Sequence, residues 1–293
     1  MSDSFKAALF VIGAMLSFTA MAIMGREVGQ DLQTFEIMTY RSVIGIILVV
    51  CIAAYFGTLN QITTERFGLH ALRNIFHFTG QNLWFYAVLY IPLSQLFAFE
   101  FATPLWIAIL APIFLGERVT QLRVIGILLG FLGILIVARP DMSTINLATL
   151  AAFGCAIFFA GTSITTKLLT RQDSLTCILF WLVVIQLVFG LAASMWDGEI
   201  TLPEWHHWPY LIVIGICGLA AHFCLTNALA LADATFVAPL EFLRLPLVAV
   251  VGFYLYDEAL LWTVFAGSLL VFGGNYLNII AQKRQAAAVA PAS

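Results

Sequence analysis

The chain has 293 residues, of which 62% are hydrophobic and 10% are charged, and its mean hydropathy is +0.99. Because soluble domains carry about 25% charged residues, this composition excludes a fold that exposes most of its surface to water and indicates a membrane protein. The net charge of −3 gives no positive excess for a nucleic-acid partner, which excludes that class of ligand.

A membrane-spanning helix needs roughly 20 predominantly apolar residues. Ten such segments follow one another along the chain, separated by short breaks that carry glycine, proline or charged residues. In chain order they are residues 6–26, 36–57, 68–90, 92–115, 119–138, 147–168, 175–196, 208–231, 235–256 and 259–281. We therefore predict an all-α membrane protein of ten transmembrane helices, with a disordered Ala-rich tail at 285–293.

The sequence repeats itself at a constant offset of 141 residues. The matched pairs include Arg26 with Lys167, Glu100 with Glu241, Glu117 with Glu258, Gly126 with Gly267 and Gly133 with Gly274. Each copy holds five spans, and an odd number inverts the second copy relative to the first, as in many secondary transporters. We therefore predict two inverted five-helix repeats, residues 1–141 and 142–284.

Two of these paired features are interpreted as structural. The paired glycines lie seven residues apart, on one helical face, and predict close packing of the fifth and tenth spans. Glu117 and Glu258 lie at symmetric span junctions, and Glu117, with Arg118 and Arg123 nearby, is expected to hold a tight turn.

The distribution of Lys and Arg predicts the orientation. If the N-terminus is cytoplasmic, nine basic residues lie on the cytoplasmic side and three on the other. The first set is Lys6, Arg66, Arg73, Arg118, Arg123, Lys167, Arg171, Lys283 and Arg284, and the second is Arg26, Arg41 and Arg139. We therefore expect a multi-pass protein of the bacterial inner (plasma) membrane with both termini in the cytoplasm.

Several short stretches carry a family likeness. Phe101–Trp106 (FATPLW) leads into Phe114–Val119 (FLGERV) and Gly130–Gly133, and a weaker parallel follows in Val237–Phe242 (VAPLEF). This pattern resembles the EamA family of the drug/metabolite transporter superfamily, over about residues 6–281. The resemblance implies a central cavity between the two halves, lined largely by the third, fourth, eighth and ninth spans. It also implies substrates such as amino acids, their derivatives, nucleoside-like compounds or vitamins.

Ionisable residues within spans are costly, at about 2.5–3.5 kcal/mol each near the helix centre, and are therefore candidates for function. Glu100 lies in the fourth span, and Glu241 and Arg244 share one face of the ninth. We interpret them as a charged pocket for a solute, with Glu241 as the central charge of the transport cycle. The alternative is that Glu241 and Arg244 only neutralise each other.

Polar and aromatic residues in other spans extend this candidate site. The third span carries a polar stripe on one helical face, and the eighth span carries a thinner one. The candidate binding residues are Asn74, His77, Gln81, Trp84, Trp106, His222 and Asn227. The alternative for these polar residues is hydrogen bonding between helices. Tyr40 and Arg41, near the outer end of the second span, are candidate gate residues, and the alternative for Arg41 is a side chain that snorkels to the membrane surface.

No motif indicates an enzyme, an ATP-driven pump or a bound cofactor. His206 and His207 are adjacent, but we expect no third ligand nearby, and an interfacial loop beside Trp205 and Trp208 is the favoured interpretation, so no metal site is predicted. We therefore expect a secondary-active transporter that moves a small polar or zwitterionic metabolite by alternating access. The alternatives are a facilitative exchanger, a channel or a non-transporting scaffold. The expected partners are the solute, the lipid bilayer and, as one candidate coupling ion, protons, in a monomer or weak homodimer.

Overall fold

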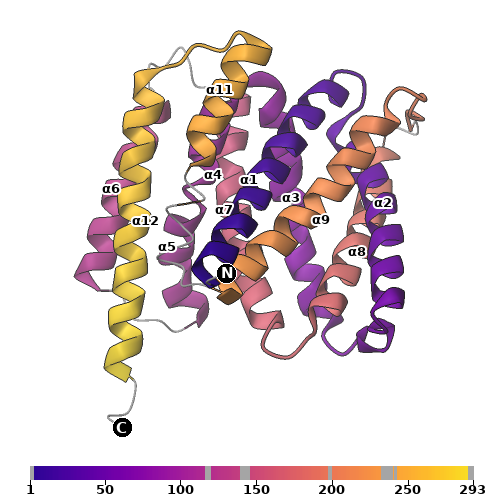
Figure 1. Ribbon diagram of the computed structural model, residues 1–293, viewed down its shortest axis with the longest axis horizontal. Helices are drawn as coiled ribbons and strands as arrows, with labels where there is room; N and C mark the ends of the chain where they lie inside the picture. Colours follow the sequence, from indigo (N-terminus) through magenta and orange to yellow (C-terminus); the bar gives the residue numbers. More distant parts are fainter. Residues whose placement is uncertain are drawn as a thin grey trace.

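A computed structural model of the chain describes residues 3–115, 120–138, 146–196, 200–231, 240 and 243–289. This part of the chain is entirely helical or irregular (Figure 1). The helices are α1 (Asp3–Val28), α2 (Thr34–Tyr55), the 3₁₀ turn η1 (Leu59–Gln61), α3 (Phe67–Tyr90), α4 (Leu93–Glu100), α5 (Thr103–Leu115), α6 (Gln121–Ala138), α7 (Leu147–Leu169), α8 (Leu175–Ser194), α9 (Trp208–Leu231), α11 (Arg244–Tyr256) and α12 (Trp262–Val289).

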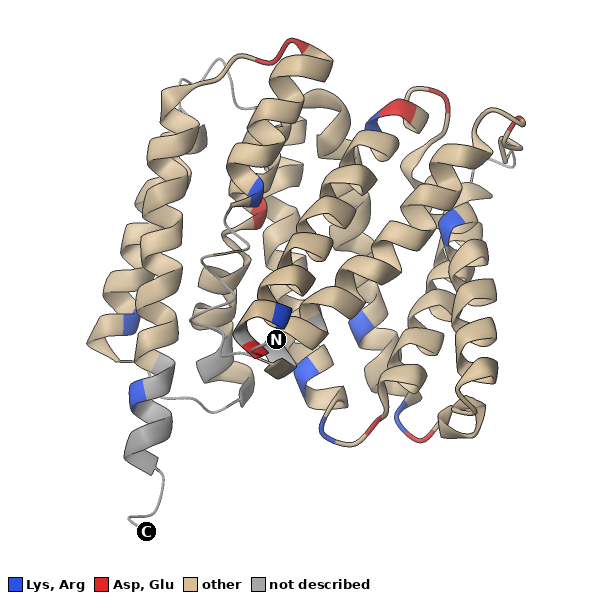
Figure 2. Ribbon diagram, viewed as in Figure 1, with Lys and Arg blue, Asp and Glu red and all other residues tan. Residues whose placement is uncertain are grey.

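The described helices account for the ten predicted spans. Seven segments are long and apolar enough to cross a membrane, and α6 and α11 are shorter apolar helices. The remaining one, α3, has 24 residues and is long enough to span, but its polar stripe lowers its hydropathy. Figure 2 shows that charged residues gather mostly at the two ends of the helices. The prediction of an all-α membrane protein is confirmed.

The fourth span is not continuous, as predicted for 92–115, but breaks into α4 and α5 at Phe101 and Ala102. Pro104 explains the break, because it lacks the N–H that would bond to the carbonyl of Glu100 and its ring opposes a regular helix. A backbone oxygen exposed at the break is satisfied, since Asn275 Nδ2 on α12 donates to Phe101 O at 2.8 Å. A broken helix of this kind is tolerated in a membrane where it is buried in protein or lines a cavity.

The two halves pack as an inverted repeat requires. Helix α1 packs against α9, and its counterpart α7 packs against α3, the counterpart of α9. In the remaining large contacts each helix packs against its own counterpart in the other repeat, α2 against α8 and α6 against α12. Figure 1 shows α6 and α12 at one end of the bundle and α2 and α8 at the other, with the remaining helices between them.

The glycines of α6 and α12 meet at a reciprocal close contact. A Cβ added to Gly133 would lie 2.4 Å from the Gly267 oxygen, and a Cβ added to Gly267 would lie 2.5 Å from the Gly133 oxygen. Gly126 and Gly274 repeat the arrangement at 2.8 and 2.4 Å. The predicted close packing of these spans is confirmed, because only glycine leaves room for the two backbones to touch.

Three sequence predictions concern the ends and junctions of the repeats. Helix α12 continues to Val289 and so includes residues 285–289 of the segment expected to be a disordered tail. The boundary between the repeats at 141 lies outside the described residues, as does Glu117. At the corresponding junction of the second repeat, between α11 and α12, Glu258 accepts the Leu93 N–H at 2.9 Å and pairs with Arg26, so its carboxylate ties this junction to α1 and to the start of α4.

Candidate substrate site

A cavity of about 130 Å³ lies in the middle of the bundle, with walls from both repeats. Its described lining comes from α1, α3 and α4 of the first repeat and α7 and α9 of the second. The lining residues are Phe18, Met21, His77, Gln81, Trp84, Glu100, Phe159, Thr162, Ser163 and His222. The cavity therefore lies between the halves, where the family resemblance places a solute.

Glu100 is the carboxylate in this lining, and the broken helix positions it. As the last residue of α4, it lies at the break, where its two oxygens accept from different helices. Trp84 Nε1 on α3 donates to Oε2 at 2.8 Å, and Arg244 Nη2 on α11 donates to Oε1 at 2.8 Å. The carboxylate thus joins the first repeat to the second.

Arg244 is buried at the first turn of α11 and is held by more than its ion pair. Its guanidinium carbon lies 4.8, 4.7 and 5.1 Å from the ring centroids of Phe18, Phe97 and Phe101. Cation–π contacts of this kind contribute about 0.5–2 kcal/mol each. The ion pair places Arg244 beside Glu100, whereas the sequence suggested Glu241 as its neighbour. Glu241 itself lies outside the described residues.

The polar stripe of α3 divides between two environments. His77, Gln81 and Trp84 line the cavity, but Asn74 does not. Asn74 Nδ2 donates to His70 O at 2.8 Å and to Trp181 O at 3.3 Å, so it bridges α3 to α8 near one end of the bundle. The stripe therefore lines the cavity at one part of its length and forms a hydrogen-bonded contact between helices at another.

The other candidate residues on α5 and α9 are spread more widely. Trp106 packs edge-on against Phe131 and Phe153 away from the cavity lining. Asn227 donates to the carbonyl of Phe223 in its own helix, whereas His222 lines the cavity and faces the His77 ring at a centroid distance of 6.0 Å.

The two candidate gate residues point in different directions. The Tyr40 hydroxyl donates to Thr201 O at 2.7 Å and so ties α2 to the segment before α9. Arg41 is 8% exposed and lines a small hollow with Gln186 and His222. The side chain therefore lies inside the bundle.

Sequence reasoning missed the contributions of α1 and α7 to the cavity. Phe18 and Met21 on α1 are apolar and resemble ordinary lipid-facing residues, so no local signal marks them. Thr162 and Ser163 do carry a signal, because they open a run of hydroxyl residues within an apolar span. The inverted packing brings these helices inward, since α1 and α7 pack against α9 and α3.

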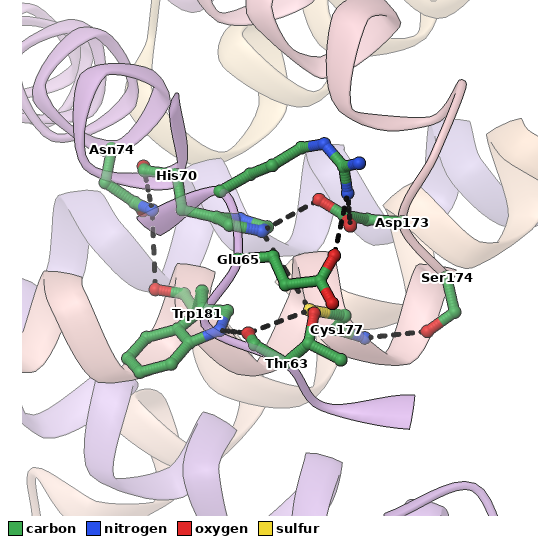
Figure 3. A network of polar contacts seen from close by, with 9 residues as sticks. Thr63, Glu65, His70, Asn74, Asp173, Ser174, Cys177 and Trp181 are labelled. Atoms are coloured by element: carbon green, nitrogen blue, oxygen red, sulfur yellow. Dashed lines mark hydrogen bonds and ion pairs between the residues drawn. The ribbon is translucent and has the colours of Figure 1, made fainter. Parts of the chain in front are cut away.

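A second polar network lies at the end of the bundle where α3 begins (Figure 3). Asp173, in the turn between α7 and α8, pairs with Arg66 at 2.8 Å and with His70 Nε2 at 3.2 Å. The thiol of Cys177 lies 3.9 Å from the same ring nitrogen. The network ties α3 of the first repeat to the second repeat, and the Arg66 contact neutralises the carboxylate that a metal would need.

The loop histidines have a third neighbour that the sequence did not reveal. Asp31 lies with its Oδ2 3.3 Å from His207 Nε2, so the reason given against a metal site there is wrong. The two nitrogens of His207 are nevertheless both engaged, because Nδ1 accepts from the Glu204 N–H at 3.1 Å. The cluster is therefore explained as a hydrogen-bonded loop anchor.

A cavity between two inverted five-helix halves, with a buried ion pair beside it that joins the halves, is the architecture of a membrane transporter. The model of the EamA-like transporter family matches the chain twice, at residues 5–139 and 146–280. The chain therefore belongs to this family, in the drug/metabolite transporter superfamily, and is a multi-pass membrane protein that transports a small metabolite.

Relatives of known activity agree with this class but differ in their solutes. The chain is 30% identical to a riboflavin transporter of Brucella anthropi over 240 residues, which cover 80% of this chain and 84% of the relative. It is 26% identical to an S-adenosylmethionine uptake transporter of Rickettsia bellii over 290 residues, covering 97% and 98%. It is also 24% identical to the pseudopaline exporter CntI of Pseudomonas aeruginosa, covering 90% and 92%.

Among the solved structures that resemble the chain, a crystal structure was compared over nearly the whole length of both chains. The TM-score is 0.66 at 16% sequence identity, with 95% of this chain and 98% of the other covered. A likeness at this identity supports the fold alone.

Proposed function

We propose that the protein is a secondary-active transporter that carries a small polar or zwitterionic metabolite by alternating access. The observation that supports this most directly is the cavity between the repeats, beside which the Glu100–Arg244 pair joins α4 to α11. A solute ammonium or hydroxyl can compete with Arg244 for the carboxylate, so binding would alter a contact between the two halves. Trp84 and Phe159 offer flat apolar surface for a ring system.

The size of the cavity supports a moving structure. Sites for small organic ligands occupy about 300–1,000 Å³, whereas this cavity has about 130 Å³. A metabolite of the size of riboflavin needs the helices around the cavity to separate. Separation of the repeats is the motion that alternating access uses.

Ion pairs join the two repeats at both ends of the bundle, as gates for such a motion would. At one end, Arg26 pairs with Glu258 and donates to the carbonyl of Val88, which links α1, α3 and the turn before α12. At the other end, Asp173 pairs with Arg66. Opening to either side would break one cluster and leave the other intact, so each end has a defined closed state.

The Lys and Arg distribution supports both termini in the cytoplasm of a bacterial inner membrane. Riboflavin and S-adenosylmethionine are the first solutes to test, since relatives carry them. Because exporters also occur among the relatives, both directions of transport need to be measured. Protons remain the candidate coupling ion, with Glu241 as the proposed coupling carboxylate.

The test is transport by the purified protein reconstituted into liposomes. Saturable uptake of labelled riboflavin or S-adenosylmethionine, with counterflow, is the expected result, and an imposed pH gradient reveals proton coupling. Gln81→Ala in the cavity should reduce uptake, whereas Gln61→Ala, in the exposed turn η1, should not. Non-saturable flux without counterflow would instead indicate a channel, and no flux of any solute would favour a scaffold.

A further inference from the structure

Two buried arginines near the cavity have no carboxylate partner in the described part of the chain. Arg41 is 8% exposed, and its guanidinium donates through Nη1 to the Met38 sulfur at 3.7 Å. Arg73 is 6% exposed and donates through Nε to Thr166 Oγ1 at 2.7 Å. A guanidinium stays protonated in proteins, so both positions carry charge in a low-dielectric interior, which is unfavourable unless an anion compensates.

The two arginines flank a pair of histidines that reaches the cavity. Arg73 precedes His77 by one turn of α3, on the same helical face. Arg41 lines its hollow together with Gln186 and His222, and His222 also lines the main cavity. The two histidine rings face each other, with 6.0 Å between their centroids. A path of polar groups therefore leads from the cavity to both guanidinium groups.

Several donors along this path are not satisfied by the described protein atoms. Arg73 Nη1, Gln186 Nε2 and both ring nitrogens of His77, one of which donates in the neutral ring, are buried and have no hydrogen-bond partner there. Buried donors without partners are rare and costly, so they point to an acceptor that the described residues do not provide. Glu100, the carboxylate of the cavity lining, is already paired with Arg244.

We propose that this cluster binds an oxyanion group, carboxylate or phosphate, of the transported solute between Arg41 and Arg73, beside His77 and His222. This inference rests on the proposed transport function and narrows its solute class to organic anions and zwitterions. The planar fork of arginine matches the two oxygens of such a group. Two arginines from different helices, α2 and α3, would then be held together only when the anion is present.

The experiment is a thermal-shift titration of the purified full-length protein in detergent. The probes are acetate, succinate and inorganic phosphate at millimolar concentration, each against sodium chloride of equal ionic strength. Wild type should be stabilised by at least one oxyanion, and Arg41→Gln and Arg73→Gln should need at least about 10-fold more of it. Arg171→Gln, which removes an exposed arginine in the turn between α7 and α8, is the matched control and should respond as wild type does.

A second measurement separates binding from structural roles. Without oxyanion, Arg41→Gln should be no less stable than wild type, because it removes an uncompensated buried charge. If a glutamine variant fails to fold, Arg41→Lys and Arg73→Lys keep the charge, lose the fork and should show a weakened response. Comparing succinate with phosphate distinguishes carboxylate from phosphate solutes.

The inference is overturned if no oxyanion stabilises wild type beyond chloride, or if the cluster variants respond as Arg171→Gln does. Riboflavin uptake by such a preparation would leave the transport function standing and remove only this inference. Stabilisation by an oxyanion without uptake or counterflow of any solute would instead support the anion site and contradict the transport function.

Discussion

The buried pair of Glu100 and Arg244 makes a quantitative prediction about stability. Their side chains are 17% and 5% exposed, and removing one partner of a buried pair costs about 3–5 kcal/mol. Glu100→Gln leaves the guanidinium among its three aromatic rings, which still contribute about 0.5–2 kcal/mol each. The loss of unfolding free energy in this variant should therefore lie near the lower end of the range for a broken buried pair. Arg244→Gln removes the cation–π contacts as well as the ion pair, so the loss of unfolding free energy should be larger than in Glu100→Gln.

The double variant Glu100→Gln/Arg244→Gln carries neither charge and places two amides where they can bond to each other. Its loss should therefore be smaller than the sum of the single losses by about 1–3 kcal/mol. The measurement is the free energy of unfolding in mixed micelles titrated with sodium dodecyl sulfate and followed by circular dichroism. Losses that add to within about 0.5 kcal/mol would refute the reasoning, because they would mean that the two residues do not interact. The exposed pair of Lys6 and Asp3 is the control, and Lys6→Gln should change little.

Three further predictions concern packing, the closed end and topology. Gly133→Ala should lower the free energy of unfolding by at least about 2 kcal/mol, because its Cβ would meet a backbone oxygen at 2.4 Å. Gly68→Ala is the control and should cost nothing, because its Cβ meets nothing within 4 Å. Equal losses in the two variants would contradict the contact between α6 and α12. Arg26→Gln should lower the melting temperature. In a Cys-free background with Ser163→Cys in the cavity lining, it should also increase labelling by a thiol reagent applied from the side of the membrane that the Arg26–Glu258 pair faces, and unchanged access would mean that this cluster is not a gate. In a Cys-free background, single cysteines at Asn60 and Asp197 should be labelled from opposite sides of the membrane, and labelling from the same side would exclude the ten-span topology.

The glycine contact shows where sequence reasoning succeeds. A seven-residue spacing places Gly126 and Gly133 on one helical face whatever the tertiary fold is. Their repetition at the offset of 141 then implies a partner face in α12, and the structure brings the two faces together. Membrane class, span positions and inverted repetition follow from composition and periodicity in the same way, because lipid imposes helices of known length.

The ion pair of Arg244 shows where sequence reasoning stops. Within the chain, Arg244 is three residues from Glu241, and helical spacing favours that neighbour. The structure places Arg244 beside Glu100, 144 residues away, because the break at Pro104 ends α4 at Glu100 and the first turn of α11 packs against α4. No local pattern carries that information.

The same limit applies to the walls of the cavity and to the buried arginines. The sequence by itself determined which residues share a helical face: His77, Gln81 and Trp84 could be grouped from their spacing alone. Only the tertiary structure decided that this face meets α1 and α7, and that Arg41 turns inward toward His222. Periodicity specifies the direction of a side chain around its own axis, whereas its neighbours depend on how the two inverted repeats pack, and that is a property of the whole chain.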